Sequence, residues 1–173
     1  MMRGYFGVGA ERISKARNLG SILRTANGFG ASFVFTVQMH HALRDINSAD
    51  TSKGAQHLPF YPWPSLEEMR LPVRCTLVGV ELTEEAIPLP SFRHPLQAAY
   101  LFGPEKGSLS DEATALCDHV VKIPTRFCVN VAVATAVILY DRMISMGSFE
   151  NRPVMTGGPP PVARWKKRAV SGP

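Results

Sequence analysis

Two short apolar runs on either side of one amphipathic helical pattern restrict the fold of this chain more than any other feature. The runs are Tyr5–Val8 and Phe33–Val37, and the helical pattern covers about Leu19–Asn27. A strand, a helix and a second strand in this order form a β-α-β unit, in which the two strands lie parallel in one sheet. The amino-terminal part of the chain therefore predicts an α/β fold.

The same alternation continues along the chain. Apolar runs without polar alternation, typical of buried strands, occur at Cys75–Val80, Ala98–Phe102 and His119–Ile123. Ser110 precedes an acidic first turn and is a suitable N-cap for a short helix. The longest helical pattern, Val129–Met146, begins with apolar or small residues on nearly every face, so it belongs in a core or an interface. We expect a mostly parallel sheet with helices on both faces.

The remaining segments are less regular. We expect a helical turn near Asp50–Gln56 and a helix at Ser65–Arg70 after the proline-punctuated segment HLPFYPWP. From Asn151 onward the composition changes to a basic stretch rich in proline and glycine, without periodicity. The sequence therefore predicts one folded domain over residues 1–150 and a flexible tail over residues 151–173.

The composition favours a folded, basic protein. With 173 residues the chain has room for one domain, and 45% hydrophobic residues exclude disorder of the whole chain. Lysine and arginine number 19 against 14 carboxylates, which gives a net charge of +5. A polyanionic partner is electrostatically favoured, and a mildly basic protein without such a partner is the alternative.

The cysteines and histidines indicate neither disulfides nor a metal site. Cys75, Cys117 and Cys128 are odd in number and form no C-x-x-C pair, and the five histidines lack metal-ligand spacing. The sequence has no signal-peptide core and no apolar run of the ~18 residues that a membrane span needs. We therefore expect a cytoplasmic protein that holds no metal and contacts no membrane.

Three common nucleotide and hydrolase motifs are absent. Gly7-Val8-Gly9 could begin a dinucleotide fingerprint, but Arg12 stands where the third glycine belongs. The segment GPEKGS does not match a P-loop, and the chain has no G-x-S-x-G nucleophile turn.

Three blocks in fixed order carry a family resemblance: NLGSILRTANGFG at Asn18–Gly30, LFGPEKG at Leu101–Gly107, and IPTRFCVNVAVATAVILYD at Ile123–Asp141. Together they resemble the SPOUT methyltransferases, in particular the TrmH/SpoU branch, over roughly residues 2–146. The resemblance implies a deep C-terminal trefoil knot, involving about Val78–Tyr140, which would be an exception to the general absence of knots. It also implies transfer of a methyl group from S-adenosylmethionine to a ribose 2′-hydroxyl of tRNA or rRNA.

The same resemblance implies the site residues. The catalytic candidates are Asn18, Arg24, Glu105 and Asn130, and the cofactor-binding candidates are Val80, Gly103, Ile123, Cys128 and Val129. Several of these follow or end predicted strands, and α/β sheets bind ligands beyond the carboxyl ends of their strands. A glycine at position 103 would let the backbone approach a ligand closely.

The chemistry leaves several roles open. Arg24 offers a planar fork of donors for the phosphate beside the target ribose, and we favour this role over that of a general base because a guanidinium rarely loses its proton. Asn130 could orient the arginine or the hydroxyl, or cap the long helix. Glu105 could pair with a basic group or be a plain first-turn carboxylate. Cys128 stands where the family usually has serine, and a thiol is the weaker hydrogen-bond donor.

The sequence leaves two interpretations open for the oligomeric state and two for the role of the tail. The apolar helix Val131–Tyr140 fits the family's homodimers or a monomer core, and in a dimer Arg24 could serve the partner's cofactor. The run Ala163–Arg168 could contact RNA or remain solvated. The alternative to the enzyme is a catalytically silent knotted RNA-binding protein, acting in RNA assembly or modification.

Overall fold

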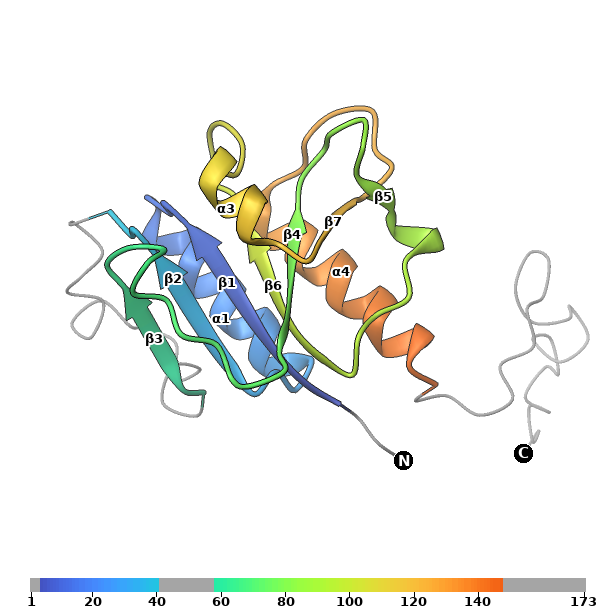
Figure 1. Ribbon diagram of the computed structural model, residues 1–173, viewed down its shortest axis with the longest axis horizontal. Coiled ribbons are helices and arrows are strands. Elements are labelled where there is room, and N and C mark those ends of the chain that lie inside the picture. The colour runs from blue at the N-terminus through green and yellow to red at the C-terminus, as the bar shows by residue number, and fades with distance from the viewer. Residues whose placement is uncertain (1–3, 41–57, 148–173) are drawn as a thin grey trace, which may run out of the picture.

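The computed structural model describes residues 4–40 and 58–147 (Figure 1). The strands are β1 (Tyr5–Glu11), β2 (Phe33–Val37), β3 (Phe60–Trp63), β4 (Thr76–Val80), β5 (Ile87–Pro88), β6 (Gln97–Phe102) and β7 (His119–Lys122). The helices are α1 (Ala16–Gly28), α3 (Asp111–Leu116) and α4 (Val131–Ser145), together with the 3-10 turn η3 (Leu89–Ser91).

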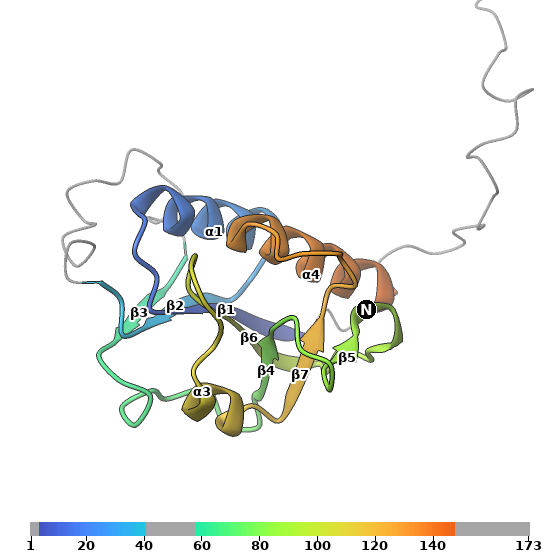
Figure 2. The ribbon, with the colours of Figure 1, turned by 90° about the horizontal axis from the view of Figure 1, so that it is seen from above.

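The described strands form one sheet in the order β3-β2-β1-β6-β4-β7-β5, and every pairing among them is parallel. Helices α1 and α4 lie side by side on one face, and α3 lies on the other (Figure 2). The predicted parallel α/β sheet with helices on both faces is confirmed. Sheet order alone does not define a knot, so the trefoil knot stays a prediction.

Two glycines of β1 make room for aromatic rings on the neighbouring strand. A Cβ atom on Gly7 would overlap the ring of Phe33, and one on Gly9 would overlap the ring of Phe35. Both rings are buried, and Phe33 stacks on Tyr5 with centroids 5.4 Å apart. The Gly-x-Gly pattern that fails as a dinucleotide fingerprint therefore serves packing within the sheet.

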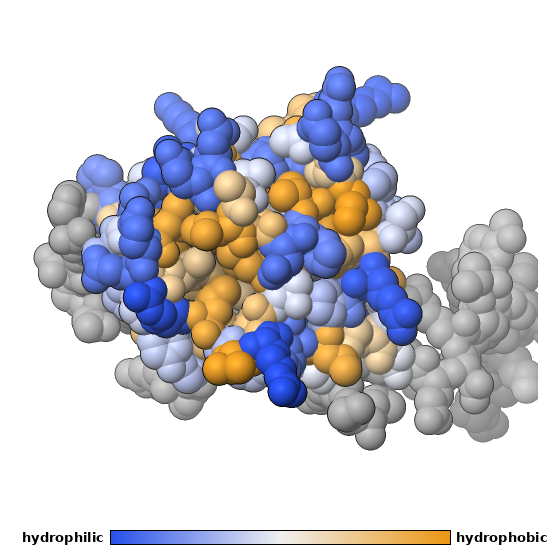
Figure 3. All heavy atoms as spheres, viewed as in Figure 1, coloured by the Kyte–Doolittle hydropathy of each residue, from blue (hydrophilic) through white to orange (hydrophobic). Residues whose placement is uncertain are grey.

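Each face of the sheet has its own hydrophobic cluster. The larger cluster lies beneath α1 and α4 and includes Leu19, Ile22 and Ile138. The smaller cluster lies on the α3 face and includes Phe33, Phe35 and Leu101. Because α3 is only one and a half turns long, the α3 face leaves apolar side chains exposed between hydrophilic ones (Figure 3).

Parallel pairing brings the carboxyl ends of β1, β4, β6 and β7 to one edge of the sheet, which we call the carboxyl edge. Each of these strands is followed by a loop. The loops cover residues 12–15, 81–86, 103–110 and 123–130. The second and third blocks of the resemblance thus start at this edge. The first block lies close to it, because it starts in the first turns of α1, directly after the loop that follows β1.

The opposite end of the sheet is tied to α4 by a buried polar network. His94 is 5% exposed, with Nδ1 2.6 Å from the Tyr100 hydroxyl and Nε2 2.9 Å from Oδ2 of Asp141. Arg142 donates to the Tyr100 oxygen over 3.0 Å and to the carbonyl of Leu96 over 2.9 Å. This network fixes the carboxyl-terminal half of α4 against β6.

The predicted helix at Ser65–Arg70 is wrong, because the structure has turns there. The Ser65 hydroxyl accepts from the backbone N–H of Glu68 over 3.3 Å, and Arg70 donates to the carbonyls of Glu67 and Met69. Such local side-chain bonds compete with helical ones.

Strands β3 and β5 were not predicted. Strand β3 contains Pro62, which lacks an N–H, and it is tolerated because β3 is the edge strand beyond β2. Strand β5 has only two residues, too few for a periodic signal. The turn predicted near Asp50–Gln56 and the tail from residue 151 lie outside the described residues.

Candidate functional site

A pocket of about 440 Å³ lies at the carboxyl edge, and we call it the edge pocket. This volume falls within the range of about 300–1,000 Å³ that is typical of small-molecule sites. The pocket is lined by residues at the ends of three strands, β4, β6 and β7, and at the starts of α1 and α4. All five cofactor-binding candidates are among the lining residues: Val80, Gly103, Ile123, Cys128 and Val129.

Glu105 joins the loop after β6 to the start of α1. Its Oε1 accepts from the backbone N–H of Lys15 over 2.8 Å and from Nδ2 of Asn18 over 3.1 Å. Its Oε2 accepts from both the backbone N–H and the hydroxyl of Ser14 over 3.0 Å. A carboxylate at this position satisfies N–H groups at the beginning of α1 and interacts favourably with the helix dipole.

These contacts keep Glu105 ionised. Burial raises the pKa of the carboxyl group, but hydrogen bonds from Ser14, from its own backbone, from Asn18 and from Lys15 outweigh that effect and lower the pKa below its ordinary value. A carboxylate that accepts several N–H bonds holds its negative charge more firmly. Glu105 therefore binds and positions the first loop, and is poorly suited to donate a proton.

Asn130 connects the last helix to the same group of contacts. Its Nδ2 donates to Oδ1 of Asn18 over 3.2 Å, and its Oδ1 accepts from the backbone N–H of Ala132 over 2.9 Å. The expectation that Asn130 caps the long helix is confirmed, since it is the N-cap of α4. Asn18, Glu105 and Asn130 thus form one hydrogen-bonded chain on the wall of the edge pocket.

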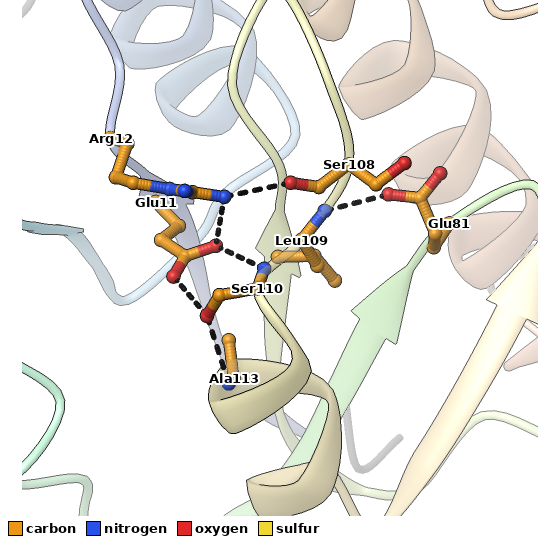
Figure 4. A network of polar contacts seen from close by, with 7 residues as sticks. All are labelled: Glu11, Arg12, Glu81, Ser108, Leu109, Ser110 and Ala113. Carbon is orange, nitrogen blue, oxygen red and sulfur yellow. Dashed lines mark hydrogen bonds and ion pairs between the residues drawn. The ribbon is translucent and has the colours of Figure 1, made fainter.

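Two further glutamates hold the loop between β6 and α3 (Figure 4). Glu11, which is fully buried, accepts from the backbone N–H of Ser110 over 2.9 Å and from its hydroxyl over 2.5 Å. Glu81 accepts from the backbone N–H of Leu109 over 2.8 Å. The predicted N-cap is confirmed, because the Ser110 hydroxyl also accepts from the N–H of Ala113.

Glu11 and Glu81 were not predicted from the sequence. Glu11 is the last residue of β1 and Glu81 directly follows β4, so both lie at the carboxyl edge. A carboxylate immediately after an apolar run is the signal that could have identified them.

The structure requires glycine at position 103 for a different reason from the one expected. A Cβ atom there would lie 2.9 Å from the backbone nitrogen of Leu109 and 3.2 Å from the carbonyl carbon of Ser108. The glycine therefore permits the loop to return past the end of β6, and this return forms part of the pocket wall. Its position in the lining is as expected, and the contact that requires glycine is with the chain itself.

Arg24 is not brought to the edge pocket of its own chain. It lies on α1, is exposed, and is absent from the pocket lining, whereas Asn18 on the same helix is buried and belongs to that lining. Residues six positions apart lie on different faces of a helix, because each residue turns by about 100°. Within one protomer the structure thus unites Asn18, Glu105 and Asn130 but leaves Arg24 outside.

A shallow apolar groove runs between α1 and α4. It is lined by Ser21, Phe29, Asn130, Ala132, Val133, Ala136, Val137 and Tyr140. Val133 is 51% exposed and Tyr140 is 47% exposed, so the groove presents a patch of apolar surface to solvent. Asn130 lines both this groove and the edge pocket, so the two adjoin at this residue.

Neither a cluster of metal-ligating side chains nor a membrane-spanning helix is found among the described residues. Within residues 4–40 and 58–147, no group of three or more His, Cys, Asp or Glu side chains is placed to hold a metal ion. No helix in these ranges is long and apolar enough to cross a membrane. The three cysteines are free thiols, and only Cys128 is exposed.

Comparison with known proteins links this geometry to one group of enzymes. The chain is 33% identical over 138 residues to a tRNA (guanosine(18)-2′-O)-methyltransferase of Thermus thermophilus, covering 76% of this chain and 70% of the relative. Its fold matches the SpoU methyltransferase AviRb of Streptomyces viridochromogenes in complex with AdoMet, with a TM-score of 0.72 and 28% identity, over 84% of this chain and 59% of that chain.

A third match, to the TrmH/SpoU tRNA modifying enzyme of A. aeolicus, has a TM-score of 0.67 at 19% identity, covers 85% of this chain and 80% of that chain, and supports the fold. The chain spans less than two thirds of the length of AviRb. The sequence profile of the SpoU rRNA methylase family matches residues 6–140, which is more than half of the chain. The chain belongs to the SpoU rRNA methylase family.

Proposed function

We propose that this protein transfers a methyl group from S-adenosylmethionine to a ribose 2′-hydroxyl of tRNA or rRNA. The observation that carries the proposal is the chain of contacts from Glu105 through Asn18 to Asn130 on the wall of the edge pocket. It unites three blocks that are far apart in a chain of the SpoU family. The Thermus thermophilus relative is named a tRNA methyltransferase, which favours tRNA as the substrate.

The edge pocket fits the cofactor in size and chemistry. Apolar side chains such as Val80, Ile123 and Val129 offer a surface for a flat adenine ring, and Asn18 and Asn130 offer polar atoms nearby. Val80, Gly103, Ile123, Cys128 and Val129 would hold S-adenosylmethionine, which supplies an electrophilic methyl group on a sulfonium.

The protein's own residues have the task of positioning. The ionised Glu105 fixes the loop before α1 and accepts a hydrogen bond from Asn18. Asn18 in turn accepts one from Asn130, so the three residues are held together. Well-oriented reactants gain several kcal/mol because the entropy of their alignment is lost before the reaction. Arg24 binds the phosphate beside the target ribose, and its guanidinium stays charged.

We further propose that the enzyme is a homodimer whose partner supplies Arg24. The groove between α1 and α4 exposes Val133, Val137 and Tyr140, and it adjoins the edge pocket at Asn130. A second copy that buries this groove would bring its own α1 near the first copy's pocket. This arrangement accounts for an exposed arginine that does not line the pocket of its own chain.

The reaction belongs in the cytoplasm, where the free thiols of Cys75, Cys117 and Cys128 remain reduced. We propose that residues 1–150 form the catalytic domain and that the tail over residues 151–173, with its run Ala163–Arg168, contacts RNA. Deletion of the tail is then expected to weaken RNA binding and its salt dependence.

The decisive experiment is transfer of a tritiated methyl group from S-adenosylmethionine to unmodified tRNA and rRNA. The product is digested to nucleosides, and 2′-O-methylribose is identified by mass. Arg24→Ala is expected to abolish transfer and to leave cofactor binding, measured by calorimetry, nearly unchanged. Cofactor binding without transfer to either RNA in the wild-type protein would instead support a catalytically silent RNA-binding protein.

A further inference from the structure

A second hollow lies beside the edge pocket, between the loop after β1 and the loop after β6. We call it the basic hollow. It is lined by Arg12, Ser14, Lys15, Pro104, Glu105, Lys106, Gly107 and Ser108. Five of these residues also line the edge pocket: Lys15, Pro104, Glu105, Gly107 and Ser108. A group bound in the basic hollow would therefore lie next to the methyl-transfer site.

The lining of the basic hollow is positively charged. Three cations, Arg12, Lys15 and Lys106, face one carboxylate, Glu105. That carboxylate already accepts from two backbone N–H groups, one hydroxyl and the amide of Asn18. In the part of the chain that the structure describes, neither lysine ammonium makes an ion pair or hydrogen bond. Their charge is therefore free for a ligand.

Arg12 has a different use. Its Nη2 donates to the carbonyl of Ser108 over 2.9 Å and lies 3.6 Å from Oε2 of Glu11 (Figure 4). The Arg12 side chain is 45% exposed, so other donors of its guanidinium can reach a ligand. Its φ of 50° lies in the left-handed region, which costs about 1 kcal/mol for a residue other than glycine.

The backbone segments that carry the two lysines are connected through Glu105. The N–H of Lys15 donates to Glu105, and Lys106 is the next residue after Glu105. The loop that carries Lys106 is fixed by Arg12 at Ser108 and by Glu11 at Ser110. Because the backbone is ordered before a ligand arrives, binding does not lose the entropy of ordering these loops.

We infer that Lys15 and Lys106, with Arg12, bind a phosphate of the RNA substrate adjacent to the methylated nucleotide. The inference rests on the proposed function. A phosphate bound in the basic hollow would fix the position of the RNA relative to the edge pocket. Phosphate contacts position a nucleic acid without reading its sequence. A compact ammonium pair open to solvent suits a phosphodiester that enters from outside.

The test compares RNA binding by a double variant, Lys15→Ala/Lys106→Ala, with binding by a control of equal charge. The control is Arg74→Ala/Arg93→Ala, because these residues precede β4 and β6 and so lie at the opposite edge of the sheet. The probe is a fluorescein-labelled, unmodified tRNA transcript, titrated by anisotropy at several salt concentrations. Affinity for S-adenosylmethionine is measured by calorimetry on the same samples.

We expect the lysine variant to bind the transcript at least tenfold more weakly and to reduce the slope of log K against log salt by about 1, because the slope counts neutralised phosphates and the two lysines share one. The control should reduce the slope by less than half of that. Affinity for S-adenosylmethionine should fall by less than affinity for the transcript, although Lys15 also lines the edge pocket. Lys15→Arg/Lys106→Arg should retain the wild-type slope, because the charges remain.

An unchanged slope in the lysine variant would overturn the inference, as would equal losses in variant and control. A selective loss of S-adenosylmethionine affinity would overturn it too, because it would assign the lysines to the carboxylate of the cofactor. Methyl transfer by the wild-type protein is scored separately. If the wild-type protein transfers methyl groups and the lysine variant keeps the wild-type salt slope, only the phosphate site in the basic hollow is refuted. If the wild-type protein binds the cofactor without transferring methyl groups, the proposed function is refuted.

Discussion

The side-chain amide of Asn130 donates to Oδ1 of Asn18 over 3.2 Å, although the two residues are 112 positions apart in the chain. Asn18 passes the connection on to Glu105 through its other side-chain atom. Because each asparagine uses its oxygen and its nitrogen for different partners, only an amide can fill both positions. A carboxylate at either position would remove a donor that the network needs.

Replacement of Asn18 by aspartate is expected to place a carboxylate against Glu105, whose Oε1 lies 3.1 Å from Nδ2 of Asn18. Asn18 is 5% exposed, so solvent screens the repulsion poorly. Asn18→Asp should lower the free energy of unfolding by about 1–3 kcal/mol in urea titrations at pH 7. Asn27→Asp, on an exposed position of the same helix, is the control; an equal loss there would contradict the explanation.

The proposed dimer predicts complementation between two inactive variants. Arg24→Ala removes the arginine, and Ile123→Trp fills the edge pocket that Ile123 lines. If Arg24 serves the partner's pocket, mixed dimers regain one working site, and an equal mixture should recover about a quarter of the wild-type rate of methyl transfer. Sedimentation of the mixture checks assembly. No recovery from a mixture that forms dimers would mean that Arg24 acts within its own chain.

Cys128→Ser is expected to keep the rate of methyl transfer within about tenfold of wild type, equivalent to about 1.4 kcal/mol of barrier. The residue lines the edge pocket and is exposed, and serine has similar size with a stronger donor. Single-turnover kinetics measure the effect. Complete loss of transfer would assign the thiol a specific role.

Alkylation supplies an independent measurement of where Cys128 lies. Burial raises the pKa of Cys75 and that of Cys117 to about 11, so both thiols should react slowly at neutral pH. Iodoacetamide should therefore modify Cys128 first and block binding of S-adenosylmethionine. Cys128→Ser should retain binding under the same treatment, and mass spectrometry of peptides identifies the modified residue.

Glu11 and Ser110 should contribute to stability in a coupled, non-additive way. Glu11→Ala leaves the Ser110 N–H and hydroxyl without their acceptor and should lower the free energy of unfolding by about 1–3 kcal/mol. Because the loop after β6 lines the edge pocket, the KM for S-adenosylmethionine should rise more than the KM for RNA. A double-mutant cycle with Ser110→Ala measures the coupling, and additive losses would contradict the proposed restraint.

His94 should make stability sensitive to pH below neutrality. Burial lowers the pKa of His94 below its ordinary 6.5 although Asp141 opposes this shift, so the folded protein holds a neutral ring. The unfolded chain takes up a proton first as the pH falls, so the stabilisation is complete above about pH 6.5 and decreases below it.

Unfolding in urea at pH 7.5 and pH 5.5 tests this expectation. A neutral ring with its proton on Nε2 donates to Asp141 and accepts from Tyr100, which matches the observed distances. His94→Gln should show a smaller decrease in stability between the two pH values than wild type, whereas the exposed His119→Gln should show the wild-type decrease. An identical decrease in the His94 variant would exclude this residue as the source.

Most of the sheet was predictable because its central strands are continuous apolar runs. Strand β2 matches its predicted bounds, and β4, β6 and β7 differ by one residue at an end. The exceptions have local causes. Pro62 concealed the edge strand β3, and side-chain bonds of Ser65 and Arg70 replaced the predicted helix.

The candidate site was predictable in part. Strand ends and the family blocks identified residues that the structure unites, namely Asn18, Glu105 and Asn130. Neither the strand ends nor the family blocks could predict on which face of α1 Arg24 lies, because that depends on how the helix packs on the sheet. Nor could spacing reveal that Glu11 and Glu81 accept from the same loop, because those contacts span 99 and 28 positions.

The link between Asn18 and Asn130 has a consequence for biosynthesis. A chain that leaves the ribosome can form β1, α1 and β2 early, but Asn18 gains its second partner only when the start of α4 has emerged. We therefore expect a nascent chain that has not yet exposed Asn130 to lack this contact and to be inactive.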